Sequence, residues 1–179
     1  MTRKSPLLVV LAVTLALLLA ACSDDSDAEA EDTSSRLDTV KERGNLIIAG
    51  RTDLAGFGFL DSSGKNVGFD IDLGRAVAAA IFGDPNAVEV RPISASERGP
   101  TIQGGEVDVL TRNVTWTSSR DAQWGNFTNV MFYDGQGFMV RTDSGFVSAM
   151  ELDGVTACVT SGTTTELNLA DFFRQNGLE

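Results

Sequence analysis

The sequence predicts an α/β fold, in which short buried strands alternate with helices. Three apolar runs have the length of buried strands, and they lie at residues 46–49, 87–93 and 107–110. One helical pattern separates the first run from the second, and another separates the second from the third. Because strands that alternate with helices usually pair in parallel, this order indicates a parallel sheet covered by helices.

The first 21 residues have the features of a signal peptide. Arg3 and Lys4 form a basic start, and an uncharged apolar run of 15 residues follows at 7–21. A membrane-spanning helix needs roughly 20 such residues, whereas signal peptides are shorter. The run ends in the letters LAAC at 19–22, which resemble the bacterial lipobox. We therefore expect a lipoprotein signal peptide at 1–21 and a lipid on Cys22; the alternative is an ordinary signal peptide.

Residues 22–35 are predicted to form a disordered tether. Six acidic residues lie between Ser23 and Ser35, with no basic and no large apolar residue among them. Such a segment cannot bury enough apolar surface to offset the entropy lost on ordering.

The composition excludes several classes of function. A net charge of −11 does not provide the basic face that nucleic acid requires, so we expect no nucleic-acid partner. The chain has no histidine, which excludes Ser-His-Asp catalysis and histidine-containing metal sites; we expect no cofactor and no metal. Of the two cysteines, Cys158 lies in an apolar stretch and is expected to be a buried small hydrophobic residue; the alternative is that it pairs with a cysteine that this sequence does not contain.

The elements around the first strand follow from local patterns. A short helix is predicted over 37–43 and is closed by Gly44. Residues 50–63 are rich in glycine and turn-forming residues, which predicts a loop. A helix over 72–82 is indicated by its alanine content and by apolar residues at four-residue spacing.

A short helix is predicted between the second and third strands. Ser96 is expected to cap it, and it runs to Gln103. Pro100 is tolerated there only within the first turn.

Further strands and a last helix are predicted after the third strand. The strand candidates lie at 127–133, 137–140 and 155–159. The last helix covers 164–176 and ends at Gly177. Thr163 and Glu166 have the spacing of a capping box at its start.

One segment carries a family resemblance. The letters GFDIDL at 68–73, with apolar residues continuing along the next helix, resemble the signature of the family 3 bacterial extracellular solute-binding proteins. Asp70 or Asp72 is expected to cap that helix. Alone, the motif also fits any strand-to-helix unit of an α/β protein. Residues 106–121 resemble the ligand segment of the same family, and 133–138 with 152–169 resemble its hinge and second lobe.

The resemblance implies a two-lobed periplasmic-binding-protein type II fold. Lobe 1 would cover 36–137, a hinge strand 138–141, and the start of an incomplete lobe 2 would cover 142–179. We therefore expect an N-terminal fragment of a longer protein. The sequence is most similar to the general L-amino-acid-binding branch, from which it departs at Arg98-Gly99-Pro100-Thr101, where that branch has a more apolar helix start.

The resemblance also implies ligand-binding residues on lobe 1. Arg120 matches the arginine that pairs with the α-carboxylate of the ligand, a task that suits a planar, two-pronged guanidinium. From the segment alone, a surface arginine fits equally well. Thr115 matches a position whose hydroxyl and amide reach the ligand, and Asn113 one whose backbone carbonyl meets the ammonium. Trp116 is expected in the core rather than in the ligand wall.

The second lobe is expected to contribute through the start of the last helix. Free amides at a helix start bind anions, and the family places those near Thr163 and Thr164 against the carboxylate. A plain helix cap without a ligand is the alternative. Thr160 stands where relatives often carry a ligand-facing side chain. Arg51 or Asp53, in the rim at 50–57, could contact the ligand side chain or be solvated.

The function implied is that of a non-catalytic binding protein. It would capture a free L-amino acid between its lobes and deliver it to ABC permease subunits, while the lipid on Cys22 holds it at the outer face of the cell membrane or in the periplasm. One alternative is an enzyme on the same fold, similar to cyclohexadienyl dehydratase, which would need an acid or base in the cleft. Another is a ligand-sensing receptor domain, which would need a transmembrane helix further along the chain.

The lipobox generates a direct prediction. Replacing the thiol in Cys22→Ala removes the atom that would be acylated, so labelling with a clickable palmitate analogue should be lost and the protein should appear in the medium. Equal labelling of the wild type and the variant, with both released, would contradict the prediction.

Overall fold

The computed structural model describes residues 35–179. The predicted signal peptide at 1–21, the lipidation site Cys22 and all of the tether at 22–35 except Ser35 lie outside the described residues. Within the described part, none of the helices has the length and hydropathy needed to cross a membrane.

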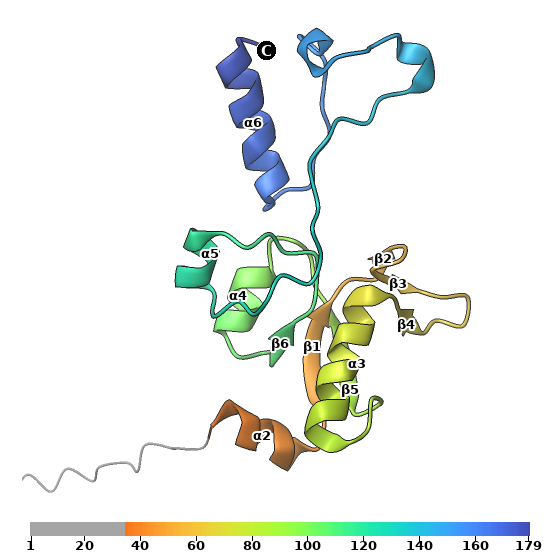
Figure 1. The fold of residues 1–179 in the computed structure, drawn as a ribbon, viewed down its shortest axis with the longest axis vertical. Helices are drawn as coiled ribbons and strands as arrows, with labels where there is room; N and C mark the ends of the chain where they lie inside the picture. The colour runs from red at the N-terminus through yellow and green to blue at the C-terminus, as the bar shows by residue number, and fades with distance from the viewer. Residues whose placement is uncertain (1–34) are drawn as a thin grey trace, which may run out of the picture. The chain divides into compact units, whose positions relative to one another are not determined.

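A three-stranded parallel sheet organises the first half of the described chain (Figure 1). Its order is β5 (Val88–Pro92), β1 (Leu46–Gly50) and β6 (Val109–Leu110), so β1 is central and pairs in parallel with both neighbours. The predicted parallel sheet is confirmed, and its third strand is shorter than expected.

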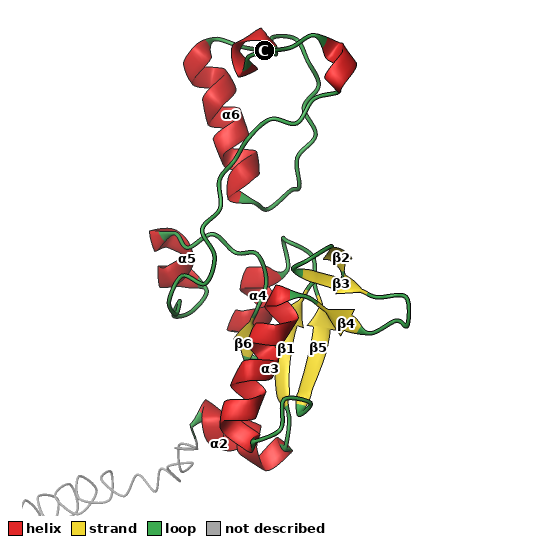
Figure 2. Ribbon diagram, turned by 45° about the vertical axis from the view of Figure 1, so that its right-hand side comes forward, coloured by secondary structure: helices red, strands yellow, loops and turns green. Residues whose placement is uncertain are grey.

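Helices α2 (Arg36–Arg43) and α3 (Phe69–Phe82) contribute side chains to a core with this sheet. Helix α2 begins with a capping box at Ser35 and ends at Gly44 in the left-handed conformation. Helix α3 packs along β1 and β5 (Figure 2). The buried cluster contains side chains from both helices and from β1: Val40, Leu46, Ile48 and Ala78.

Helix α3 starts earlier than predicted, and neither Asp70 nor Asp72 caps it. The N-cap is Gly68, with no side-chain cap, and the amides of Phe69 and Asp70 donate to the carbonyls of Gly56 and Phe57 at 2.9 Å. A neighbouring loop thus satisfies the first amides of the helix, and a capping carboxylate has no task there.

The expected loop at 50–63 contains ordered pairing. Strands β2 (Asp53–Leu54), β3 (Gly58–Leu60) and β4 (Asn66–Val67) form a small antiparallel sheet. The turn between β3 and β4 is organised by Asp61, whose carboxylate accepts hydrogen bonds from two backbone amides. The segment expected to be a loop because of its glycine content therefore takes part in two β-hairpins.

Helix α4 (Arg98–Gln103) is capped differently from the prediction. Its N-cap is Glu97 rather than Ser96, and the Glu97 carboxylate accepts a hydrogen bond from the amide of Ser94 at 2.7 Å. Helix α5 (Ser118–Gln123) follows β6, and Thr117 caps it by accepting the amide of Arg120.

The predicted strands after α5 are not strands. Residues 127–133, 137–140 and 155–159 have no ladder partner within the described chain, so their apolar character does not produce a sheet. Side-chain packing holds part of them instead: Phe132 lies edge-on to Phe57, with ring centroids 5.0 Å apart. Cys158 is exposed, and its expected burial is wrong because no sheet forms around it.

The last part contains two 3₁₀ turns, η2 (Thr142–Ser144) and η3 (Ala149–Glu151), and helix α6 (Thr164–Asn176). The bounds of α6 agree with the prediction, including Gly177 in the left-handed conformation. Half of the capping box is present: the amide of Glu166 donates to Thr163, whereas the Glu166 carboxylate accepts from Gly162 rather than from Thr163.

The close approach at Gly68 generates a stability prediction. Gly68 lies at φ 118° and ψ 173°, a region that only glycine occupies readily, and a Cβ there would lie 2.3 Å from the carbonyl oxygen of Phe57. Gly68→Ala should lower the free energy of unfolding by about 3 kcal/mol.

Urea unfolding measures the effect, and Gly135→Ala is the matched control. No atom lies within 4 Å of the ideal Cβ at Gly135, so that change should stay within about 0.5 kcal/mol of the wild type. Equal effects at the two glycines would contradict the prediction.

Candidate functional site

The candidate site lies at the carboxyl ends of the three parallel strands. The chain leaves β1 toward β5 on one side and later returns to β6 on the other, so the connections diverge between β1 and β6. Ligands of open α/β sheets bind at such a divergence point. The loops that follow β1 and β6 meet there, and Arg51 Nη1 donates to Asn113 Oδ1 at 3.1 Å.

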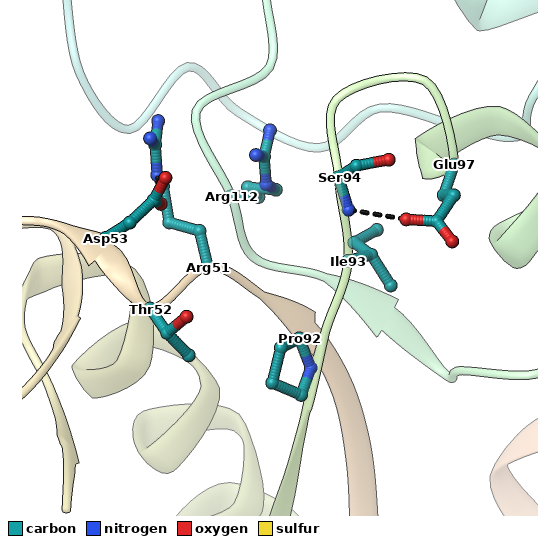
Figure 3. Close-up of a pocket in the computed structure, with 8 residues that line it drawn as sticks. All are labelled: Arg51, Thr52, Asp53, Pro92, Ile93, Ser94, Glu97 and Arg112. Carbon is teal, nitrogen blue, oxygen red and sulfur yellow. Dashed lines mark hydrogen bonds and ion pairs between the residues drawn. The ribbon is translucent and has the colours of Figure 1, made fainter. Parts of the chain in front are cut away.

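A cavity of about 290 Å³ opens beside this point (Figure 3). Its lining combines two guanidinium groups with two carboxylates and small polar or apolar residues: Arg51, Thr52, Asp53, Pro92, Ile93, Ser94, Glu97 and Arg112. The Asp53 carboxylate accepts from Arg51 Nε at 2.7 Å, and the Glu97 carboxylate accepts from the Ser94 amide. In Figure 3, the guanidinium groups of Arg51 and Arg112 point toward the same side of the cavity.

Arg98 connects three separate segments at the edge of the site. Its side chain is 2% exposed. Nε donates to the carbonyl of Ala95 at 2.7 Å, Nη1 to that of Asn113 at 2.9 Å, and Nη2 to that of Gly162 at 2.9 Å. The arginine therefore joins the loop after β5, the loop after β6 and the loop before α6.

Arg120, in helix α5, is 8% exposed. Its Nη1 donates to the carbonyl of Thr115 at 3.0 Å, and its guanidinium carbon lies 4.7 Å from the centre of the Trp124 ring. Arg98 lies 5.8 Å from the same ring centre. Gly99 makes room for the indole, because a Cβ there would lie 2.6 Å from Trp124 Nε1. One aromatic ring thus supports both buried cations.

The electrostatics of the site are dominated by arginine. Burial, with repulsion from Arg120, Arg112 and Arg51, lowers the pKa of Arg98 to about 10. Burial also lowers the pKa of Arg120 and, with repulsion from Arg51, that of Arg112. All these groups remain charged at neutral pH. The arrangement is suited to binding an anion.

Asp70 lies buried near these arginines. It is 5% exposed, and its Oδ2 has no hydrogen-bond partner within residues 35–179. Burial raises the pKa of the Asp70 carboxyl, and the charges of Arg51 and Arg112 oppose that rise. The net direction is upward, because desolvation outweighs attraction across a gap that no hydrogen bond closes.

The structure brings several of the predicted ligand residues together. Thr115 lies opposite Thr164, with their hydroxyl oxygens 2.9 Å apart, and its carbonyl is the acceptor for Arg120. The backbone carbonyl of Asn113, expected to meet a ligand ammonium, accepts from Arg98. A carbonyl oxygen has two lone pairs, so a second donor can share it.

The remaining predicted residues lie around the start of α6 and the rim. Thr163 caps α6, and its hydroxyl donates to the carbonyl of Thr160 at 2.7 Å. The side chain of Thr160 is exposed. The two rim candidates pair with each other, and the Asp53 side chain is 72% exposed, whereas that of Arg51 is 18% exposed.

Trp116 is not a core residue, contrary to expectation. It is 51% exposed and stacks on Phe127 with nearly parallel rings whose centroids are 6.1 Å apart.

Sequence reasoning missed the roles of Arg98, Arg112 and Asp70. Arg98 was noted only as part of an unusual helix start. Arg112 lies two residues after the third predicted strand, in the region where ligand sites gather, and that position is the available signal. Within the described residues, no three potential metal ligands among aspartate, glutamate and cysteine come together.

Comparison with known proteins assigns these features to a family. Residues 46–176 match the bacterial extracellular solute-binding proteins, family 3. The chain is 51% identical over 148 residues to the general L-amino acid-binding periplasmic protein AapJ of Rhizobium johnstonii, covering 82% of this chain and 43% of the relative. It is 50% identical to the glutamate/glutamine/aspartate/asparagine-binding protein BztA of Rhodobacter capsulatus, covering 82% and 44%.

A solved structure is similar along the same part of the chain. It is an ABC transporter periplasmic binding protein from Brucella ovis with glutathione bound, with a TM-score of 0.77 and 49% sequence identity, covering 82% of this chain and 46% of that one. Over this part the chain has the type II periplasmic-binding-protein fold, and it spans less than half the length of these relatives.

The raised pKa of Asp70 generates a pH prediction. Between the ordinary value of 3.8 and the raised folded value, the folded state holds a proton that the unfolded state has lost, so the wild type loses stability as pH rises through this window. Asp70→Asn does not titrate. The free energy of unfolding of the variant minus that of the wild type should therefore increase with pH from about 4 and level off above the folded pKa.

Urea unfolding of both proteins at a series of pH values measures this difference. Glu42→Gln, an exposed position on α2, provides the control for loss of one negative charge. If the difference in the free energy of unfolding between Asp70→Asn and the wild type stays constant or decreases over this pH range, the ionised carboxylate of Asp70 is not destabilised by burial.

Proposed function

The chain belongs to family 3 of the bacterial extracellular solute-binding proteins, and from this premise we propose that it captures L-amino acids for an ABC importer. The ligand would lie at the carboxyl ends of β1 and β6, between the first lobe and the segment that begins α6. Two observations support the proposal. The relatives are named as amino-acid-binding proteins, and buried arginine side chains lie close together at this edge of the sheet.

The observation that carries the proposal is the state of Arg120. Within residues 35–179, Nη1 is the only one of its three side-chain nitrogens that donates to protein. The remaining nitrogens are available to a carboxylate, and the Trp124 ring beneath the guanidinium restricts its orientation. A fixed cation with unused donors is suited to binding the α-carboxylate of an amino acid.

We propose that the opposite side of the ligand meets the start of α6. Thr163 and Thr164 lie at the amino end of this 13-residue helix, where free amides and the helix dipole favour an anion. The contact between Thr164 and Thr115 places this helix end beside the segment that holds Arg120. Asn113 would offer its carbonyl to the ammonium, and Thr160 would extend the same wall.

The proposed organisation assigns residues 36–137 to lobe 1, 138–141 to the hinge and 142–179 to lobe 2. Residues 1–21 would be the signal peptide, and a lipid on Cys22 would hold the protein at the outer face of the membrane, near its permease. The family and the relatives are solute-binding proteins, which favours binding over catalysis. A dehydratase-like activity would require an additional catalytic acid or base.

The binding prediction concerns Arg120→Ala in the complete gene product. Removing a charged partner from a buried carboxylate costs about 2–5 kcal/mol, or roughly 30-fold and upwards in Kd. Calorimetric titration with a panel of L-amino acids and glutathione measures the loss; glutathione is included because the similar Brucella ovis structure contains it.

Arg174→Ala is the matched control, because that arginine lies exposed on α6 and pairs only with Asp171 within the described chain. Its affinities should equal those of the wild type. Unchanged affinity in Arg120→Ala, with circular dichroism showing an intact fold, would remove Arg120 from the binding site.

A further inference from the structure

Arg112 differs from the other arginines of the site in what it contacts. Arg51 is bonded to Asp53 and Asn113, and Arg98 to three carbonyls. Arg112 lines the cavity, but within residues 35–179 it has no ion pair and its buried Nε has no hydrogen-bond partner. Its donors are therefore not committed to the protein.

Three carboxylates lie close enough to influence the pKa of Arg112, but none of them forms a hydrogen bond or ion pair with it. The attraction of Asp53, Asp70 and Glu97 opposes the lowering of the Arg112 pKa by burial. Asp53 is held by Arg51, and Glu97 by the amide of Ser94. Asp70 is buried with an unpaired oxygen. The acids near the cavity are thus already bonded or buried, and the guanidinium of Arg112 remains available.

The cavity has room for a small polar group. Its volume of about 290 Å³ is several times the roughly 30 Å³ that one water occupies in the liquid. Arg112 is the second residue after β6 and lies next to Asn113, the residue proposed to meet the ligand ammonium. A side chain that leaves an α-carbon held beside Asn113 can therefore enter the cavity and end near Arg112.

We propose that Arg112 is a specificity-determining residue that binds a second carboxylate, at the end of the ligand side chain. The preferred ligands would then be L-amino acids with an acidic side chain, bound with the α-carboxylate on Arg120 and the distal carboxylate on Arg112. This inference rests on the proposed function and specifies the ligand class for the same site.

The opposite preference, for a basic side chain bound by Glu97, is less well supported. One Glu97 oxygen is already bonded to Ser94, and a ligand cation would enter beside two guanidinium groups. Repulsion between like charges disfavours that arrangement.

The test compares L-glutamate with L-glutamine, which differ in charge but hardly in shape. In calorimetry with the complete gene product, the wild type should bind L-glutamate more tightly. Arg112→Gln should lower the affinity for L-glutamate by roughly 10- to 100-fold and the affinity for L-glutamine by less than about threefold. Only the charged ligand loses a charge-assisted hydrogen bond. Arg112→Lys, which restores the charge, should recover part of the L-glutamate affinity.

Arg91→Gln is the matched control, since Arg91 pairs with Glu106 outside the cavity; both affinities should stay at the wild-type values. Equal weakening of both ligands by Arg112→Gln, no preference for L-glutamate in the wild type, or tighter binding of L-lysine than of L-glutamate would each overturn the inference while leaving amino-acid binding intact. A wild type that binds no amino acid would instead overturn the proposed function, and this inference with it.

Discussion

The guanidinium of Arg98 is the interaction on which the rest of the site depends. It satisfies three backbone carbonyls from loops that are far apart in the sequence, at Ala95, Asn113 and Gly162. A buried arginine usually has a carboxylate partner, and here carbonyl dipoles take that place. The charge is therefore stabilised but not neutralised, and the carboxyl edge of the sheet remains positive.

The indole of Trp124 stabilises the positive charge that is buried here. Arg98 and Arg120 are two buried cations in one small region, and each lies over the same aromatic ring. The negative face of the ring attracts both cations and fixes the orientation of Arg120. The absence of a side chain at Gly99 is what allows the indole to reach this position. The anion-binding geometry thus follows from a packing detail of one short helix.

Local patterns predicted the parallel sheet and helices α2 and α6 well, because periodicity and terminal glycines act within a few residues. The start of α3 was misjudged because its amides are satisfied by Gly56 and Phe57, a tertiary contact with no local sequence signal. The apolar segments after α5 were predicted as strands, but a strand also requires a partner, which a segment's own sequence does not specify. Arg98 could not be distinguished from a surface arginine, because its role depends on carbonyls supplied by other elements, whereas the position of Arg112 after a predicted strand carried a signal.

The use of backbone carbonyls by Arg98 also determines how the site responds to its surroundings. Carbonyl groups do not titrate, and Arg98 itself keeps its proton until pH about 10. The connection between the loops after β5 and β6 and the loop before α6 therefore contains no group that changes charge below about pH 10. These three hydrogen bonds therefore persist over the pH range in which the carboxyl of Asp70 titrates.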